Sequence, residues 1–155
     1  MLGCVLASVV LAGCASSAMP SGAVVTYSYR DASVPPQFHR SVTLTVTQDA
    51  SRILIDSYGE VLAERTVPTP AAVWAALGQS LDDVKAVRPS EPPAGCTGGT
   101  GRTVTVVAGS QTLADVSAEF CGGSNAGVDS TVDAWIQPAR ELFPPTEDLA
   151  PASDD

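Results

Sequence analysis

The chain has 155 residues and a formal net charge of −9, from 17 acidic and 8 basic side chains. This charge would repel nucleic-acid phosphates and anionic lipid headgroups, so the composition argues against a nucleic-acid-binding protein. Hydrophobic residues make up 45% of the chain, which is ordinary for a globular protein and sufficient for one core.

The first fourteen residues have the pattern of a bacterial export signal. Residues 5–12 are apolar and uncharged. They are too few to span a bilayer, which takes about 20 residues, and small residues follow them as at a signal-peptide cleavage site. The sequence Leu11-Ala12-Gly13-Cys14 resembles the bacterial lipobox, although no basic residue precedes Arg30. The resemblance implies that residues 1–13 are a signal peptide, that Cys14 carries acyl chains such as palmitate, and that the protein faces outward from the cell membrane.

The remainder divides into three parts by composition. Residues 14–23 are small and polar with Pro and Gly, which predicts a flexible tether. Residues 24–143 are long enough for a single domain. Residues 144–155 are proline-rich and acidic, which predicts a disordered tail.

Alternating β-branched and polar residues predict strands in the first half of the domain. The alternation covers residues 24–30, 41–48, 52–58 and 60–67. The sequence Tyr58-Gly59-Glu60 interrupts it, so this point is either a hairpin turn or a bulge within one long strand.

A helix is predicted next, over residues 70 to about 85. Thr69 suits the N-cap and Pro70 the first helical position. The apolar residues that recur at helical spacing, and therefore face a core, are Val73, Leu77, Leu81 and Val84.

A hairpin and a disulfide are predicted together in the second half. Residues 103–108 and 112–121 read as strands joined by a two-residue turn at Gly109-Ser110. This turn sets Cys121 opposite residue 98, two positions from Cys96. Two cysteines in an exported chain favour a disulfide, and with one distant histidine they do not form a zinc site.

The last predicted helix begins at a cap provided by Ser130, with Asp133 three residues later as in a capping box. Its apolar face includes Trp135 and Ile136. Pro138 lies inside it and is expected to kink the helix or split it in two.

These elements predict an α+β domain. We expect an antiparallel sheet of about five to six strands with two helices on one face, in the order β-β-β-(β)-α-β-β-α. This order of strands, helix, hairpin and helix is similar to that of emfourin-like metalloprotease inhibitors. The resemblance implies a protein–protein inhibitor, and it assigns no inhibitory residue.

No group of residues has the spacing of a catalytic, nucleotide or metal site. His39 is expected in a solvated loop, and no serine has the G-x-S-x-G context of a hydrolase nucleophile. The glycine-rich run 95–102 lacks the lysine of a phosphate-binding loop. Asp82-Asp83 lies on one helix and cannot converge on a calcium ion, so we expect a solvated face.

Aromatic residues give one candidate binding surface. Trp74 and Trp135 fall on core-facing helix positions and are expected to be core residues. Tyr27, Tyr29 and Tyr58 lie in predicted strands and could share one face.

The sequence therefore predicts a non-enzymatic binding or scaffolding domain at the cell envelope, without cofactor or metal. Its expected partners are the membrane, through Cys14, and an envelope protein. Two alternatives remain: a protein inhibitor of a secreted or envelope protease, and a carrier of a small ligand or lipid in a cavity between sheet and helices.

Overall fold

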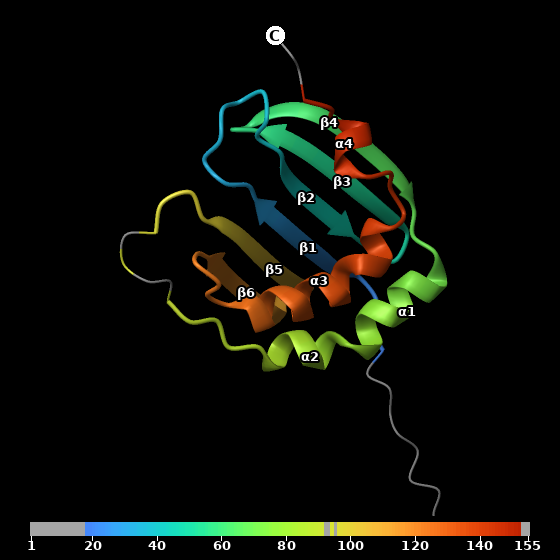
Figure 1. The fold of residues 1–155 in the computed structure, drawn as a ribbon. Helices are drawn as coiled ribbons and strands as arrows, with labels where there is room; N and C mark the ends of the chain where they lie inside the picture. Colours follow the sequence, from blue (N-terminus) through green and yellow to red (C-terminus); the bar gives the residue numbers. More distant parts are fainter. Residues whose placement is uncertain (1–17, 92–93, 95, 153–155) are drawn as a thin grey trace, which may run out of the picture.

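Six antiparallel strands form one sheet in the spatial order β4-β3-β2-β1-β5-β6, with helices packed on one of its faces (Figure 1). The computed structural model describes residues 18–91, 94 and 96–152. The strands are β1 Ala23–Arg30, β2 Ser41–Val46, β3 Ala50–Ser57, β4 Glu60–Pro68, β5 Thr100–Ala108 and β6 Gln111–Phe120, and the helices are α1 Ala71–Gln79, α2 Leu81–Ala86, α3 Ala126–Arg140 and α4 Thr146–Leu149. The predicted α+β class is confirmed, whereas the predicted lipobox and signal segment lie outside the described residues.

The alternation of each strand divides the sheet into a core face and an open face. In β2, Val42, Leu44 and Val46 are buried and the residues between them are half-buried. Their neighbours Val25 and Tyr27 of β1 continue the core face across the sheet. The open face carries hydroxyl side chains on the central strands, including Thr26, Ser28, Thr43, Thr45, Thr103 and Thr105. The hydroxyl side chains allow this face to contact water while the opposite face forms the core.

The predicted hairpin at Gly109-Ser110 is present, and the interruption at Tyr58-Gly59 is a hairpin turn rather than a bulge within one strand. Tyr58 and Gly59 join β3 to β4 with φ of 52° and 91°, the left-handed pair that a two-residue turn requires. Gly109 and Ser110 join β5 to β6, since Ala108 is paired with Gln111. A register shift between Val106 and Val107 then places Thr100 opposite Phe120. The predicted register, which set Cys121 opposite residue 98, is therefore wrong by one position.

The predicted helix 70–85 is interrupted. The first segment, α1, ends at Gln79 and α2 begins at Leu81. At the break, the Ser80 hydroxyl donates to the Ala76 carbonyl at 2.9 Å, a bond that competes with the helical ladder. Thr69 is not the N-cap: the capping residue is Pro70, without a side-chain bond, and the Thr69 hydroxyl lies 2.8 Å from that of Ser51.

Helix α3 differs from its prediction at both ends. It begins at Ala126, one residue after Asn125, so Ser130 lies inside it and donates to the Gly127 carbonyl at 3.1 Å. Pro138 does not split the helix, which continues to Arg140. The proline has no N–H to donate to the Ala134 carbonyl, and the helix continues for two residues beyond it.

The predicted disordered tail is wrong for residues 144–152. These residues include α4, and Ala150 is buried with 5% of its surface exposed. The Arg40 guanidinium donates to the carbonyls of Ala150 and Pro151 at 2.7 and 2.6 Å. An apolar contact and charged hydrogen bonds therefore hold a segment whose composition alone resembles a disordered one.

The predicted tether is also ordered at its end. Ala23 already belongs to β1, and Met19 is 8% exposed. Met19 packs on Gly78 of α1, where an added Cβ would lie 2.6 Å from the Met19 nitrogen. The glycine thus lets the incoming chain lie directly against the helix.

We expect Gly78→Ala to destabilise the domain, although alanine favours helices by about 1 kcal/mol over glycine. The new methyl group must displace the backbone at Met19. Gly127→Ala in α3 is the matched control, because a Cβ there meets nothing within 4 Å. Urea unfolding should give opposite signs for the two variants, and two stabilising substitutions would contradict the packing of Met19.

Candidate protein-binding surface

The loop between β1 and β2, residues 31–40, is closed at its base by one carboxylate. Asp31 accepts hydrogen bonds from the backbone nitrogens of Ala32 and Arg40, both at 2.8 Å, and from the Tyr29 hydroxyl at 3.2 Å. The Asp31 nitrogen donates to the Ser41 hydroxyl at 3.1 Å. These bonds fix the two ends of the loop relative to each other.

His39 does not lie in a solvated loop, as the sequence predicted. It is 4% exposed, and its ring stacks on that of Tyr58 with centroids 3.9 Å apart. Its Nδ1 lies 3.4 Å from the Tyr58 nitrogen and its Nε2 lies 3.4 Å from the Ser41 hydroxyl. The imidazole therefore joins the loop to the β3–β4 turn.

Two further bonds join the same segments. The Ser57 hydroxyl donates to the Pro36 carbonyl at 2.8 Å, and the Tyr58 hydroxyl donates to the Val34 carbonyl at 2.6 Å. In Figure 1 the loop arches beside the β3–β4 turn at the end of the sheet. We call these two segments, residues 32–39 and 57–62, the tip.

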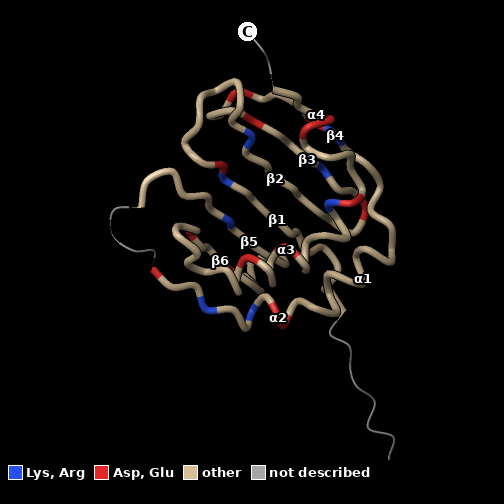
Figure 2. The backbone as a smooth tube through the Cα atoms, in the orientation of Figure 1, with Lys and Arg blue, Asp and Glu red and all other residues tan. Residues whose placement is uncertain are grey.

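The tip carries most of the large apolar side chains that the described residues expose. Phe38, Tyr58 and Val61 are 54%, 56% and 55% exposed, and Leu62 is 38% exposed. Val24, at the other end of β1, is the fifth such residue. Residues 32–38 contain no charged side chain, and the arch of the loop is uncoloured in Figure 2. Exposed aromatic and aliphatic side chains on a fixed backbone are typical of protein-binding surfaces.

The three tyrosines do not share a face, contrary to the candidate surface predicted from sequence. Tyr27 is buried at 1% exposure, Tyr29 is half-buried beside Arg102, and Tyr58 lies in the turn. Sequence reasoning named Tyr58 but missed Phe38. The available signal was an uncharged stretch in which two prolines precede an aromatic residue.

A polar cluster lies between the sheet and α3. Arg102, with 13% of its side chain exposed, is paired with Asp129 and Asp133 at 2.7 and 2.9 Å. Its guanidinium also lies 5.0 Å from the ring centre of Tyr29 and 5.3 Å from that of Phe120. The cluster joins β5 to α3, and its charges are paired with each other rather than directed at a ligand.

Tyr27 lies within this cluster, and burial raises its pKa to about 12 from 10.0. Its hydroxyl has no hydrogen-bond partner among residues 18–91, 94 and 96–152. The unfolded chain loses the Tyr27 proton near pH 10, whereas the folded chain keeps it until about pH 12. The contribution of the Tyr27 proton to the free energy of unfolding is therefore fully present below pH 10. It is lost as the pH rises from about 10 to about 12.

We expect the free energy of unfolding to fall by about 1.4 kcal/mol per pH unit in that window because of Tyr27. Tyr27→Phe should remove this contribution and leave the neutral-pH stability nearly unchanged, since the hydroxyl makes no bond. Tyr58→Phe is the control at an exposed position. Urea titrations at pH 9, 10 and 11 measure the slopes, and equal slopes for wild type and Tyr27→Phe would contradict the assignment.

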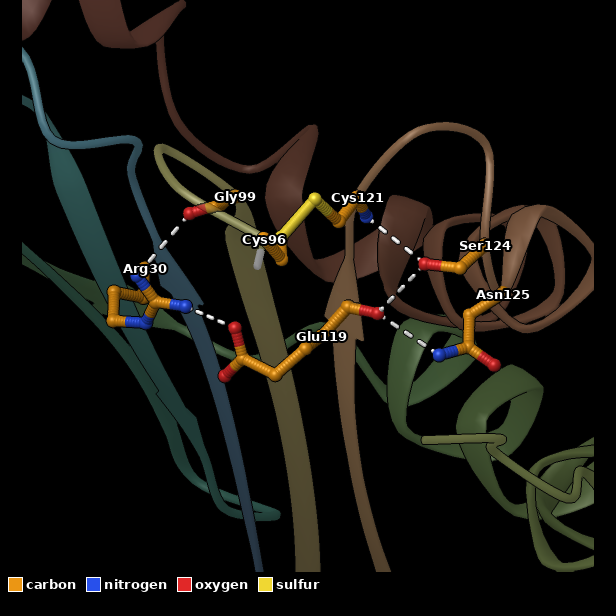
Figure 3. Close-up of a disulfide and its surroundings, with 7 residues drawn as sticks. All are labelled: Arg30, Cys96, Gly99, Glu119, Cys121, Ser124 and Asn125. Carbon is orange, nitrogen blue, oxygen red and sulfur yellow. Dashed lines mark hydrogen bonds and ion pairs between the residues drawn. A yellow bond between two sulfur atoms is a disulfide. The ribbon is translucent and has the colours of Figure 1, made fainter. Parts of the chain in front are cut away.

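The predicted disulfide between Cys96 and Cys121 is present (Figure 3). It joins the segment before β5 to the end of β6. Beside it, Arg30 forms an ion pair with Glu119 and donates to the Gly99 carbonyl at 3.2 Å. Gly101 lies beneath this pair, because an added Cβ would lie 3.0 Å from Glu119 Oε1.

The other residues considered from sequence lie in structural positions. Trp74 and Trp135 belong to the core. Asp82 is paired with Lys85 at 2.9 Å on the surface of α2. Within the part of the chain that the structure describes, no three His, Cys, Asp or Glu residues are grouped as metal ligands.

Two surface hollows lie against the helices. One of about 630 Å³ lies between α2 and α3, and one of about 500 Å³ lies where α3 turns toward α4, above Ile53 and Phe143. The space between the helices and the sheet is filled by buried side chains of the core cluster. These observations favour a surface that binds a partner over an internal ligand cavity.

The fold and the tip define a single sheet-and-helix domain with an apolar surface at one end. Comparisons with protein-family models, with curated proteins and with solved structures find no match to this chain. In the described ranges, no helix has the length and apolar character needed to cross a membrane.

Proposed function

We propose that this chain is an outward-facing envelope lipoprotein, tethered through Cys14, whose domain binds an envelope protein with its tip. The observation that carries the proposal is the position of the tip relative to the start of the domain. β1 enters the sheet at Ala23 beside α1 and reaches the tip loop after Arg30. Eight strand residues span about 26 Å, so the tip lies at the far end of the sheet from the tether.

The short connection to Cys14 supports this orientation. Met19 follows Cys14 by five positions, and a chain of that length spans at most about 17 Å. Acyl chains on Cys14 would therefore keep the α1 end of the domain near the membrane and leave the tip directed away from it. More than one chain gives a stable anchor without a basic surface, which agrees with the net charge of −9.

An inhibitor of a secreted or envelope protease is the second candidate. It is favoured by the fixed conformation of the tip loop, which Asp31 and His39 hold in place while Phe38 is exposed. Protease inhibitors bind through surfaces whose backbone moves by less than about 1 Å. Inhibition of a secreted metalloprotease at micromolar protein, lost in Phe38→Ser, would favour this candidate over scaffolding.

The anchor and the tip are tested in the same host cells. Palmitate labelling and fractionation should place the wild-type chain in the membrane and release Cys14→Ala into the soluble fraction. A photo-crosslinking residue at position 38 or 61 should capture one discrete envelope protein, and position 24 should not. Phe38→Ser and Val61→Ser should each weaken binding to that protein about 30-fold, as expected for central interface residues, while Val24→Ser leaves it unchanged.

The proposed lipid anchor would be overturned if palmitate did not label the wild-type chain, or if Cys14→Ala stayed in the membrane fraction. Equal crosslinking from positions 24 and 38 would overturn the tip as the binding surface. Circular dichroism and thermal unfolding of each variant separate a lost contact from a lost fold.

A further inference from the structure

A groove of about 720 Å³ runs along the free edge of β6. One wall consists of β6 from Leu113 to Ser117 together with Glu119, and the other consists of residues 87–91 with Lys85. Consecutive residues of a strand point to opposite faces, and residues 113–117 all line the groove. The groove therefore opens on the edge of the strand rather than on one face of the sheet. Since β6 is the last strand in the sheet order, this edge has no neighbouring strand among the described residues.

The side chain of Asn125 shows how wide the gap is at one end. Its Nδ2 donates to the carbonyls of Glu119 on β6 and Ser90 on the opposite wall, both at 2.9 Å. Its Oδ1 accepts from the Ser90 nitrogen at 2.8 Å. One carboxamide thus bridges the two walls, as the backbone amide of an inserted strand would. At this end, the gap between β6 and residues 87–91 is the width of one extended chain.

The backbone of β6 presents its polar groups to this gap. The Glu119 carbonyl points away from β5, because it accepts from Asn125 and from the Ser124 hydroxyl (Figure 3). Backbone direction repeats every second residue along a strand, so the amides and carbonyls of Ser117 and Asp115 point the same way. These groups form the pattern to which an added strand pairs.

We propose that the edge of β6 binds an extended peptide segment of a protein partner, which pairs with Asp115 and Ser117 and lies between β6 and residues 87–91. This site is separate from the tip and does not rest on the proposed function.

The residues that line the groove indicate which side chains a bound peptide should carry. On the core side, the peptide would lie beside the small apolar residues Ala114 and Val116 and across from Val87. On the open side it would lie beside Asp115, which forms no ion pair with the described residues, whereas Glu119 is already paired with Arg30. On the opposite wall, Glu91 adds a second carboxylate, and the Arg88 guanidinium donates to the carbonyls of Lys85 and Val87. Alternating apolar and basic residues match the β6 wall, and the net charge of −9 attracts such a peptide.

The probe is a six-residue peptide of alternating valine and arginine with blocked ends, added to the full chain in mild detergent. We expect a dissociation constant below about 1 mM, and the amide hydrogens of Asp115 and Ser117 should exchange about tenfold more slowly when the peptide is bound. Peptides with glutamate in place of arginine, or with a central proline, should not bind. Absence of binding at 1 mM, or protection only at residues outside the groove, would overturn the proposal.

Two variants test the groove itself. Ser117→Pro removes an outward amide hydrogen that β5 does not use, and an edge strand tolerates this change. Asp115→Lys reverses the charge at the open side without altering the backbone. Each should weaken peptide binding at least about tenfold while Thr43→Lys, on the same open face but away from the edge, leaves it unchanged.

Three outcomes separate this site from the tip and from other occupants. Phe38→Ser should bind the peptide normally, because Phe38 lies in the tip and not in the groove. A failed test of the tip therefore leaves the groove proposal intact, and a failed test of the groove leaves the tip proposal intact. Protection of Asp115 and Ser117 that increases with protein concentration and without peptide would assign the edge to a second copy of the chain. Binding that persists in both Ser117→Pro and Asp115→Lys would place the peptide elsewhere and overturn the proposal.

Discussion

Replacing both Cys96 and Cys121 by serine is expected to lower the free energy of unfolding by about 3.5 kcal/mol. The bridge closes a loop with a sequence separation of 25 residues. In the chain-entropy model, a loop of that length in the unfolded chain loses about 12 cal/mol/K. Since domains of this size are stable by about 5–15 kcal/mol, the variant should lose a large share of its stability.

Urea unfolding of the oxidised wild type and the double variant measures this difference. The double alanine variant, Cys96→Ala with Cys121→Ala, is the control. It also lacks the bridge but introduces no serine hydroxyl groups, so it isolates the effect of the lost bridge. If both double variants lost less than about 1 kcal/mol in the free energy of unfolding, the bridge would not constrain the unfolded chain as the chain-entropy model assumes. The double serine variant should also bind the valine–arginine peptide more weakly, because the bridge fixes Cys96, five positions after Glu91 of the groove wall, to Cys121 at the end of β6.

The second large effect is expected at Trp135, whose replacement by alanine should cost about 4 kcal/mol. The indole is 4% exposed, and its Nε1 donates to the Leu77 carbonyl at 3.0 Å. Leu77 lies in the last turn of α1, where carbonyls lack helical partners. Trp135 therefore fills the core and also satisfies a carbonyl at the break between α1 and α2.

Trp135→Phe should cost more than Trp74→Phe, by about 1 kcal/mol, because it removes this hydrogen bond as well as part of the ring. Trp74 is a fair comparison, since it is similarly buried at 8% exposure and has no side-chain hydrogen bond in the described structure. Denaturant midpoints and slopes of Trp135→Ala, Trp135→Phe and Trp74→Phe give the values. Equal costs for the two phenylalanine variants would mean that the Leu77 carbonyl finds another partner.

Local pattern was sufficient to predict the strands, the β5–β6 hairpin and the disulfide, and it left the interruption at Tyr58-Gly59 open between a hairpin and a bulge. The alternation at Val42, Leu44 and Val46 is strict because one face of β2 is core and the other is open. The turn residues Tyr58-Gly59 and Gly109-Ser110 determine the connections. Pattern could not show that β5 pairs with β1, since 69 residues separate the two strands and no local signal links them.

The errors at His39 and in the C-terminal segment share a cause, which is contact between distant segments. His39 is buried because Tyr58 stacks on it, and Ala150 is ordered because Arg40 reaches its carbonyl. The break at Ser80 depends partly on Trp135, 55 residues later. The sequence did not predict the tip or the β6 groove for the same reason. Each is formed by two segments that are far apart in the sequence and close together in the fold.

The central position of β1 has a mechanical consequence. β1 is flanked by β2 and β5, and it connects the point where the chain enters the domain to the tip. A tension between residue 18 and a partner held at Phe38 would act along the axis of β1, at right angles to the hydrogen bonds on both sides. Both hydrogen-bond ladders would have to break together before β1 could move, so the domain resists tension applied between residue 18 and the tip.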